Sequence, residues 1–322
     1  MTRRFAPRRC SLLLLALVSL AVPSFSVAQQ PTRAIAITVD DLPAVSLRRD
    51  VATHAAITRG ILDAFRRYGV PAIGFVNESK LADGDRIDSA RVALLRAWLD
   101  AGMQLGNHSY SHPDLHGVPL EQYEDDVLRG ERVTRSLLAE RGLEPRWFRH
   151  PFLHTGTDLD TKRRFERFLD EHGYRVAPVT FDNYDFIFAR VYERTVESGD
   201  RGTAQRVADA YVAYMDSVVG YYEAQSRTLF GTEPAQVLLL HANRLNADHV
   251  GRVLESLVRR GYRFVTIDEA LRDPAYSQPD EYIGAGGITW LHRWALTAGK
   301  RGAVFAGEPT VPEWIATRFE GR

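Results

Sequence analysis

Cysteine is almost absent from this chain of 322 residues, and its one cysteine, Cys10, lies in an N-terminal segment that we expect to be removed. The mature protein would then have neither a disulfide nor a thiol nucleophile, which excludes the hydrolases that attack with a cysteine. An exported protein without disulfides must be stabilised by its hydrophobic core alone. With 45% hydrophobic residues and a length common among α/β barrels, the chain can form such a core as one domain.

The chain also lacks a clear membrane-spanning run. Its N-terminal apolar run, Ser11–Val22, is shorter than the roughly 20 residues that a spanning helix needs. Arginines precede this run and Ser26-Val27-Ala28 follows it, so residues 1–28 have the layout of a secretory signal peptide that is cut after Ala28. We therefore expect a periplasmic or secreted protein with no membrane span after signal removal. An uncleaved anchor is less consistent with the sequence, because no long flanking apolar stretch follows.

Neither sign of charge predominates. The whole chain has 41 basic and 41 acidic residues, and removal of residues 1–28 takes away four arginines, which leaves 37 basic against 41 acidic residues and a net charge of −4. A mildly acidic protein is a poor match for the phosphate backbone of nucleic acid. We therefore expect no nucleic-acid partner.

What the sequence does contain is a repeated alternation of short β-like runs with amphipathic helical stretches. Several helical stretches stop at a glycine, as at Tyr68-Gly69, which is a typical helix end. Repeated strand–helix units indicate parallel strands with right-handed crossovers. The seven expected strands are Ala34–Val39, Ala72–Val76, Met103–Gly106, Trp147–Arg149, Arg175–Thr180, Val237–Leu240 and Arg263–Ile267.

This pattern predicts an α/β fold, a distorted seven-stranded (β/α) barrel. The stretch Phe186–Pro234, between the fifth and sixth strands, does not fit the repeat, and we expect it to contain one inserted helix, Ala204–Gln225. The expected domains are the signal peptide (1–28), the barrel (29–272) and a C-terminal extension packed on the barrel (273–322).

Polar residues follow the expected strands, and this is where (β/α) barrels place their chemistry. Asp40-Asp41 ends the first strand, and His108 and His112 follow the third. One carboxylate and two imidazoles are a common shell for a catalytic divalent metal that keeps positions open for water, and the second carboxylate could act as a base. Either cluster alone could be an ordinary cap or loop. Together they indicate a metal-dependent hydrolase.

Further candidates follow the later strands. Arg149 could hold a carboxylate through two hydrogen bonds, or form a surface ion pair. The run Asp182–Phe186 could orient catalytic groups and pack aromatic rings against a sugar, or it could simply make a turn. His241 could be a buried core histidine, but the end of a barrel strand makes it a candidate general acid.

Taken in order, these clusters resemble the five motifs of the polysaccharide deacetylases, a family that includes chitooligosaccharide and peptidoglycan deacetylases. The resemblance covers roughly residues 34–271, and three aromatic or apolar positions differ from the usual motif residues (Val39 for Phe, Phe152 for Tyr, Phe186 for Trp). The matching runs are Thr38–Asp41, His108–His112, Arg149–Phe152, Asp182–Phe186 and Leu239–His241.

The resemblance implies a role for each matching residue. The metal, most often zinc, with Co²⁺, Ni²⁺ or Mn²⁺ as alternatives, would be bound by Asp41, His108 and His112. Asp40 would be the general base, and Arg149 would position it.

His241 would be the general acid. Either Asp182 or Asp185 would orient it, and the sequence leaves this choice open. The backbone N–H of Phe152 would stabilise the oxyanion. The implied substrate-binding residues are Phe152, Tyr184 and Phe186.

The implied protein is an exported deacetylase that removes N-acetyl groups from an amino-sugar polymer or oligosaccharide by means of metal-activated water. Its partner would thus be an acetylated glycan. One alternative keeps the site and changes the substrate to O-acetyl esters or a small non-peptide amide. A second alternative is a barrel that binds carbohydrate without catalysis, and the competent residues at all the implied catalytic positions argue against it.

Overall fold

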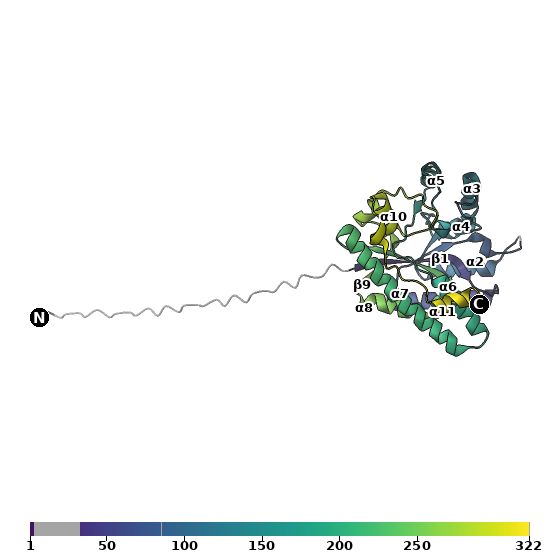
Figure 1. Cartoon of the computed structure of the whole chain (residues 1–322), viewed down its shortest axis with the longest axis horizontal. Coiled ribbons are helices and arrows are strands. Elements are labelled where there is room, and N and C mark those ends of the chain that lie inside the picture. The colour runs from purple at the N-terminus through teal and green to yellow at the C-terminus, as the bar shows by residue number, and fades with distance from the viewer. Residues whose placement is uncertain (3–32, 85, 322) are drawn as a thin grey trace. The chain divides into compact units, whose positions relative to one another are not determined.

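A curled sheet of seven parallel strands lies at the centre of the computed structural model, which describes residues 1–2, 33–84 and 86–321 (Figure 1). The expected signal peptide, apart from Met1 and Thr2, lies outside the described residues. The strands of this sheet are β1 (Arg33–Val45), β2 (Ile73–Val76), β5 (Gln104–Asn107), β6 (Trp147–Phe148), β7 (Arg175–Val176), β8 (Gln236–Asn243) and β9 (Tyr262–Val265). The remaining pair, β3 (Ala82–Asp83) and β4 (Arg86–Ile87), forms a small antiparallel hairpin.

The pairing of the strands gives a distorted barrel. The order is β7-β6-β5-β2-β1-β8, and β9 also pairs with β1. Residues 35 and 36 of β1 pair with both β8 and β9, whereas residues 38 and 39 pair with both β8 and β2. Thus β9 and β2 follow one another along the same edge of β1. After β7, Phe181 forms a bridge with Leu238 of β8, which brings the two ends of the sheet together. The expected fold is confirmed.

Alternation along β1 explains which of its side chains enter the barrel. Ile35, Ile37 and Val39 belong to the large core between the sheet and the surrounding helices. Ala36 packs instead in a smaller core inside the barrel, with residues from β2, β6, β8 and β9. Since side chains alternate between the two faces of a strand, Asp40 continues the inward-facing series at the carboxyl end of β1.

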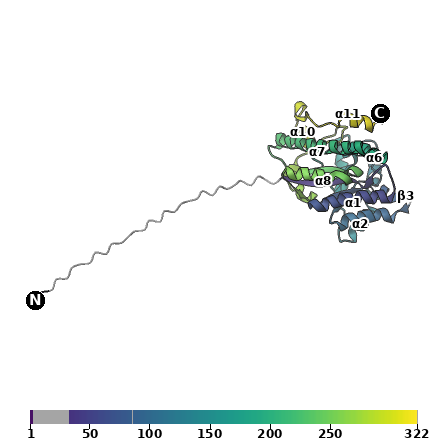
Figure 2. The same cartoon turned by 90° about the horizontal axis from the view of Figure 1, so that it is seen from below.

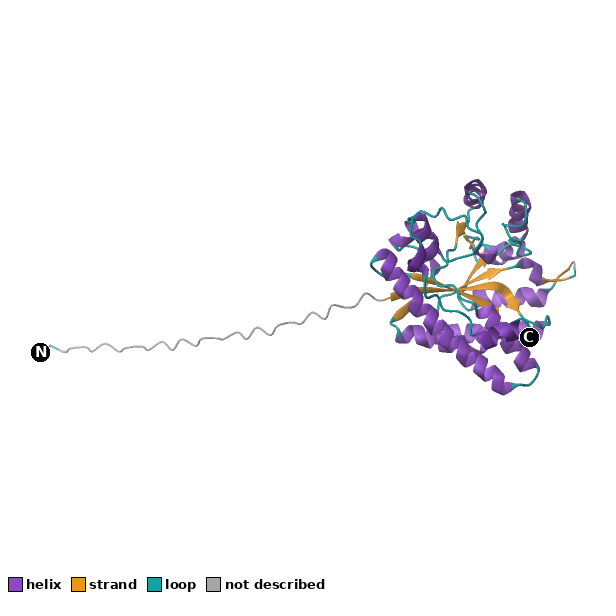
Figure 3. Cartoon of the chain, viewed as in Figure 1, coloured by secondary structure: helices purple, strands orange, loops and turns teal. Residues whose placement is uncertain are grey.

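Helices cover the outside of the sheet (Figure 3), and α2, α1, α8 and α7 lie next to one another in this layer (Figure 2). The helices are α1 (Val51–Tyr68), α2 (Ser89–Asp100), α3 (Leu120–Arg129), α4 (Arg132–Ala139), α5 (Leu159–Glu171), α6 (Asp185–Glu197), α7 (Arg201–Phe230), α8 (Arg244–Arg259), α9 (Ile267–Ala270), α10 (Trp290–Thr297) and α11 (Glu313–Phe319). Among the described residues, none of these helices combines the length and the apolar character required to cross a lipid bilayer.

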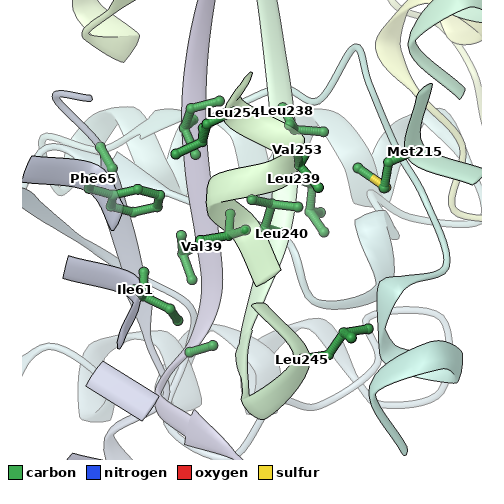
Figure 4. Close-up of a cluster of buried hydrophobic side chains, with 14 of the residues drawn as sticks. Val39, Ile61, Phe65, Met215, Leu238, Leu239, Leu240, Leu245, Val253 and Leu254 are labelled. Atoms are coloured by element: carbon green, nitrogen blue, oxygen red, sulfur yellow. The ribbon is translucent and has the colours of Figure 1, made fainter. Parts of the chain in front are cut away.

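The main core forms where α1 and α8 pack on β1 and β8. Apolar residues of α1 recur at helical spacing, so Ile57, Ile61 and Phe65 share one face and are all buried. The helix ends at Gly69, whose φ of 64° satisfies the left-handed position of the cap. Figure 4 shows this core, with the labelled residues Val39, Ile61, Phe65, Met215, Leu238, Leu239, Leu240, Leu245, Val253 and Leu254.

Two details differ from the sequence prediction. The expected strand Arg175–Thr180 is regular only over β7, because Pro178 has no N–H to donate to a neighbouring strand. The segment expected to contain one helix contains two, α6 and α7, and they are separated at Gly199, which has a φ of 78°. The expected helix Ala204–Gln225 lies within α7.

Candidate active site

A cleft of about 540 Å³ opens at the carboxyl ends of the strands. All the candidate residues from the sequence line it except Arg149 and Asp185, which are fully buried. The candidate residues that line the cleft are Asp40, Asp41, His108, His112, Phe152, Asp182, Tyr184, Phe186 and His241. The barrel therefore brings together residues that are up to about 200 positions apart in the sequence.

Asp41, His108 and His112 form a group that fits a divalent metal, since their donor atoms all lie within 4.8 Å of one another. Asp41 Oδ1 is 3.9 Å from His112 Nε2. His108 Nδ1 donates a hydrogen bond to the carbonyl oxygen of Arg149 at 2.8 Å. This bond fixes the ring tautomer and leaves Nε2 as the atom with a free lone pair, which is the usual arrangement of a histidine that binds a metal.

The backbone is strained around this group. Among the described residues, the non-glycine residues with positive φ are Asp41, Ser109, His112, Phe152 and Leu153, with φ between 56° and 73°. All five lie in or directly after the motif runs Thr38–Asp41, His108–His112 and Arg149–Phe152. Positive φ is uncommon for residues other than glycine and persists where the surrounding structure holds it, which is frequent at functional sites. At Asp41 the positive φ turns the chain, so that two adjacent carboxylates can lie at one site.

Asp40 is held by Arg149 inside the barrel. Arg149 Nη1 lies 3.4 Å and 3.3 Å from the two carboxylate oxygens of Asp40. The same guanidinium donates to Ala177 O at 2.9 Å and to Thr38 Oγ1 at 3.1 Å, so its position is fixed. Burial raises the pKa of Asp40 to about 6, and the charge of Arg149 limits the rise. A carboxylate with a pKa near neutrality is well suited to accept a proton.

His241 forms a hydrogen-bonded pair with Asp185. Its Nδ1–H donates to Asp185 Oδ1 at 2.6 Å, and its backbone N–H donates to Oδ2 at 2.8 Å. Asn246 Nδ2 also donates to Asp185 Oδ2, at 2.7 Å. Burial alone would lower the pKa of His241, but the carboxylates of Asp185, Asp41 and Asp40 together outweigh burial and raise it to about 9. The imidazole is therefore protonated at neutral pH.

The sequence left open whether Asp182 or Asp185 orients His241, and the two carboxylates have different partners in the structure. Asp185 contacts His241, whereas Asp182 accepts a hydrogen bond from the backbone N–H of Asn183 at 2.8 Å. Asp182 still lines the cleft, and burial raises its pKa to about 7.

Lys80 is a site residue that the sequence analysis missed. Its Nζ lies 3.0 Å from Asp41 Oδ1 and donates to Asp41 O at 3.2 Å. Burial by itself would raise the pKa of Asp41, but Lys80 and the histidines around it hold this pKa well below its ordinary value. Lys80 lies in the short turn Glu78–Leu81 after β2, outside the five motifs, and only the folded chain reveals its partner.

The rim of the cleft is apolar. Phe152, Tyr184 and Phe186 are 53%, 45% and 43% exposed, and Val45 and Leu47 are also exposed beside them. Such a rim offers flat ring faces to a ligand.

The loop that follows Val45, the last residue of β1, and carries Leu47 is attached to α6. Glu193 accepts a hydrogen bond from the backbone N–H of Leu47 at 2.9 Å and another from the hydroxyl of Ser46. The first helix of the inserted segment therefore fixes one wall of the cleft.

A second group, Asp114, His116 and His154, also has donor atoms within 4.8 Å of one another. These atoms are already in hydrogen bonds: His154 Nδ1–H donates to Asp114 Oδ1 at 2.7 Å, and His116 Nε2 accepts from Gly156 N–H at 3.2 Å. The two imidazole rings are stacked, with centroids 3.9 Å apart and planes 5° apart. Parallel rings cannot both direct an in-plane lone pair at one ion, so this group is a hydrogen-bonded contact between loops.

Comparison with known proteins relates the sequence to one family. Residues 28–177, a little under half of the chain, match the sequence model of the family described as polysaccharide deacetylase. A peptidoglycan-N-acetylglucosamine deacetylase of Listeria monocytogenes is 23% identical over 253 residues, which are 78% of this chain and 41% of that protein. A chitin deacetylase of Colletotrichum lindemuthianum is 23% identical over 242 residues, which are 74% of this chain and 79% of that protein. The chain thus spans less than half the length of the Listeria protein.

A solved structure, the peptidoglycan deacetylase PdaC of Bacillus subtilis, is 21% identical to the chain. The similarity covers 75% of this chain and 91% of that one, with a TM-score of 0.46.

Proposed function

We propose that the protein is an exported, metal-dependent N-deacetylase of an amino-sugar polymer or oligosaccharide. The match of residues 28–177 to the polysaccharide deacetylase model supports this proposal. The observation that carries the proposal is the arrangement of Asp40. This buried carboxylate lies beside the three candidate metal ligands, with 3.8 Å between its Oδ2 and His108 Nε2. It shares the cleft with His241, the residue with which Asp40 is in register across β1 and β8.

In this proposal Asp41, His108 and His112 hold a divalent cation, most often zinc for a set of one carboxylate and two imidazoles. A bound cation there supplies a water whose pKa is lowered to about 7 and a positive charge beside the acyl oxygen. Asp40 accepts the proton of the attacking water, and Arg149 keeps the carboxylate oriented. Together these residues generate the nucleophile.

The other residues act on the acetyl group and on the leaving amine. The N–H of Phe152 donates to the acyl oxygen as negative charge develops on it. His241 gives its Nε2 proton to the leaving nitrogen, because expulsion of an unprotonated amine would create a strongly basic anion. Asp185 holds the ring through Nδ1, and Tyr184 and Phe186 pack against the sugar. Residues 29–272 would then be the catalytic domain of a periplasmic or secreted protein, and residues 273–322 its extension.

The first test is an acetate-release screen with metal analysis. We expect purified protein to contain about one equivalent of a divalent metal, to release acetate from N-acetylated glycans, to lose this activity on chelation and to regain it with Zn²⁺ or Co²⁺. Chitooligosaccharides, peptidoglycan, acetylated xylan and a small acetamide are compared. Release of acetate from acetylated xylan alone would show that the substrate is an O-acetyl ester. Binding of glycans without any release of acetate would show that the barrel is not catalytic.

A second prediction concerns pH. Asp40, with a pKa of about 6, must be deprotonated to act as a base, and His241, with a pKa of about 9, must be protonated to act as an acid. The rate should therefore rise as the pH passes about 6 and fall as it passes about 9. In Asp185→Asn the carboxylate that raises the pKa of His241 is lost, so the alkaline limb of the kcat profile should move to lower pH while the acidic limb stays in place. An unchanged alkaline limb would contradict the assignment of His241.

A further inference from the structure

The turn that carries Phe152 has a backbone conformation that its own residues do not favour. Phe152 and Leu153 are consecutive non-glycine residues in the left-handed region, both with φ of 56°. The Phe152 side chain is 53% exposed, so its burial contributes little to the turn. Contacts from other parts of the chain must therefore hold this conformation.

Hydrogen bonds within the turn leave one donor free. The N–H groups of Leu153 and His154 donate to the carbonyls of His150 and Pro151, at 3.1 Å each. Among the described residues, the N–H of Phe152 has no acceptor, although Phe152 lines the cleft. The turn thus offers one backbone donor to a ligand.

The C-terminal extension contacts this turn directly at Gly287. A Cβ atom at Gly287 would lie 1.7 Å from the carbonyl oxygen of Phe152 and 3.3 Å from His154 Cδ2, so no side chain fits there. The neighbouring Gly286 has ordinary space, since the nearest atoms to its Cβ position are 3.8 Å away. Neither glycine has a positive φ, so the absence of a side chain at Gly287 is explained by its contact with Phe152.

Arg293 of α10 contacts the same turn from within the protein. It is 1% exposed, and its guanidinium donates to Leu153 O at 3.3 Å and to the hydroxyl of Thr155. Its Nε donates to Asp280 Oδ2 at 2.8 Å, and the same carboxylate oxygen lies 2.8 Å from Lys162 Nζ. Asp280 therefore fixes the guanidinium that holds the carbonyl of a strained residue.

The extension is itself attached to the barrel. The N–H of Trp290 donates to Val179 O at 2.7 Å, and the indole of Trp290 packs on the Arg293 guanidinium at 4.5 Å. Backbone, aromatic and charged groups thus all contribute to holding the extension in one position on the barrel.

We propose that the C-terminal extension is a positioning element of the active site, in which Gly287 and Arg293 hold the Phe152 N–H in the orientation that meets the acyl oxygen. This inference rests on the proposed deacetylase function. It assigns a role in the reaction to residues outside the stretch that matches the family, residues 28–177. Both residues act through the turn, so they are positioning residues.

The matched pair Gly287→Ala and Gly286→Ala tests the proposal. Loss of one oxyanion donor typically lowers kcat by about 10²–10³-fold, so Gly287→Ala should lower kcat by about 100-fold with KM changed less than about threefold and with full metal content. Gly286→Ala should retain the wild-type kcat. Equal kcat in the two variants would overturn the proposal. A loss of kcat in both variants that parallels a loss of Tm would overturn it as well.

Arg293 provides a second comparison. Arg293→Met removes all the hydrogen bonds that the guanidinium donates and should lower kcat at constant metal content. Arg293→Lys keeps one charged donor, and its kcat should be at least about tenfold higher than that of Arg293→Met. A merely structural role would give the two variants the same kcat once each is measured well below its Tm, and this result would contradict the inference.

Hydrogen exchange separates this inference from the proposed function. In Gly287→Ala, the N–H groups of Leu153 and His154 should exchange faster than in Gly286→Ala, whether or not a substrate is known. If the wild-type protein releases no acetyl group but this difference appears, the proposed function fails and the extension still positions the turn. If the wild type is active and both variants exchange alike, the positioning role is wrong and the function stands.

Discussion

Asp40→Asn is expected to lower kcat by about 10²–10⁴-fold, the usual contribution of a general base, with the metal content unchanged. The amide keeps the size of the carboxylate but cannot accept the proton of water. Folding should be retained, because burial already raises the pKa of Asp40 to about 6, and the site thus disfavours the negative charge that the variant removes. Steady-state kinetics, metal analysis and Tm together check this result.

The comparison variant is Asp182→Asn. Asp182 is a second, half-buried carboxyl in the cleft with a raised pKa, about 7, but its hydrogen bond is to the neighbouring backbone N–H of Asn183. We expect a loss at least about tenfold smaller than for Asp40→Asn. If Asp182→Asn gave the larger loss with full metal occupancy, the base would be Asp182 and the assignment of Asp40 would be wrong.

His112→Ala is expected to remove the metal together with the activity. His112 is a better target than His108, since its side chain is 26% exposed and that of His108 only 3%, so truncation disturbs the core less. Even changes to groups that only orient a metal ligand lower affinity by about 10–100-fold, so loss of a ligand should lower it by more than about 100-fold. Calorimetric titration of metal-free protein with Zn²⁺ measures the effect.

The matched control is His116→Ala, in the second Asp-His-His group. This variant should bind one equivalent of Zn²⁺ with wild-type affinity, because His116 is engaged by Gly156 and stacks on His154. The reverse pattern, in which His116→Ala loses the metal and His112→Ala keeps it, would place the metal in the other group.

The fold and the gathering of the candidate residues in one cleft were predictable because both depend on local sequence signals. Each strand is a short apolar run, and the candidate residues lie where these runs end, so the order of the motifs predicts which side chains converge. Helix α6 was missed because it begins inside the motif Asp182–Phe186, whose polar and aromatic residues are equally typical of a turn.

Other parts of the site depend on contacts that no local pattern encodes. Lys80 reaches Asp41 from a turn that follows a different strand, and a single lysine in a short turn has no distinctive sequence signal. Likewise, the choice between Asp182 and Asp185 is a matter of which side chain points toward His241 once α6 has formed. Gly287 and Arg293 lie more than 130 residues after the turn that they contact.

Arg149 joins the two halves of the site through different parts of one residue. Its guanidinium binds Asp40, while its main-chain oxygen receives the ring proton of His108. A substitution at position 149 therefore alters only the first of these contacts, since every amino acid brings the same peptide oxygen. If the proposed function is right, mutagenesis at this single position can thus separate loss of the base from loss of the metal.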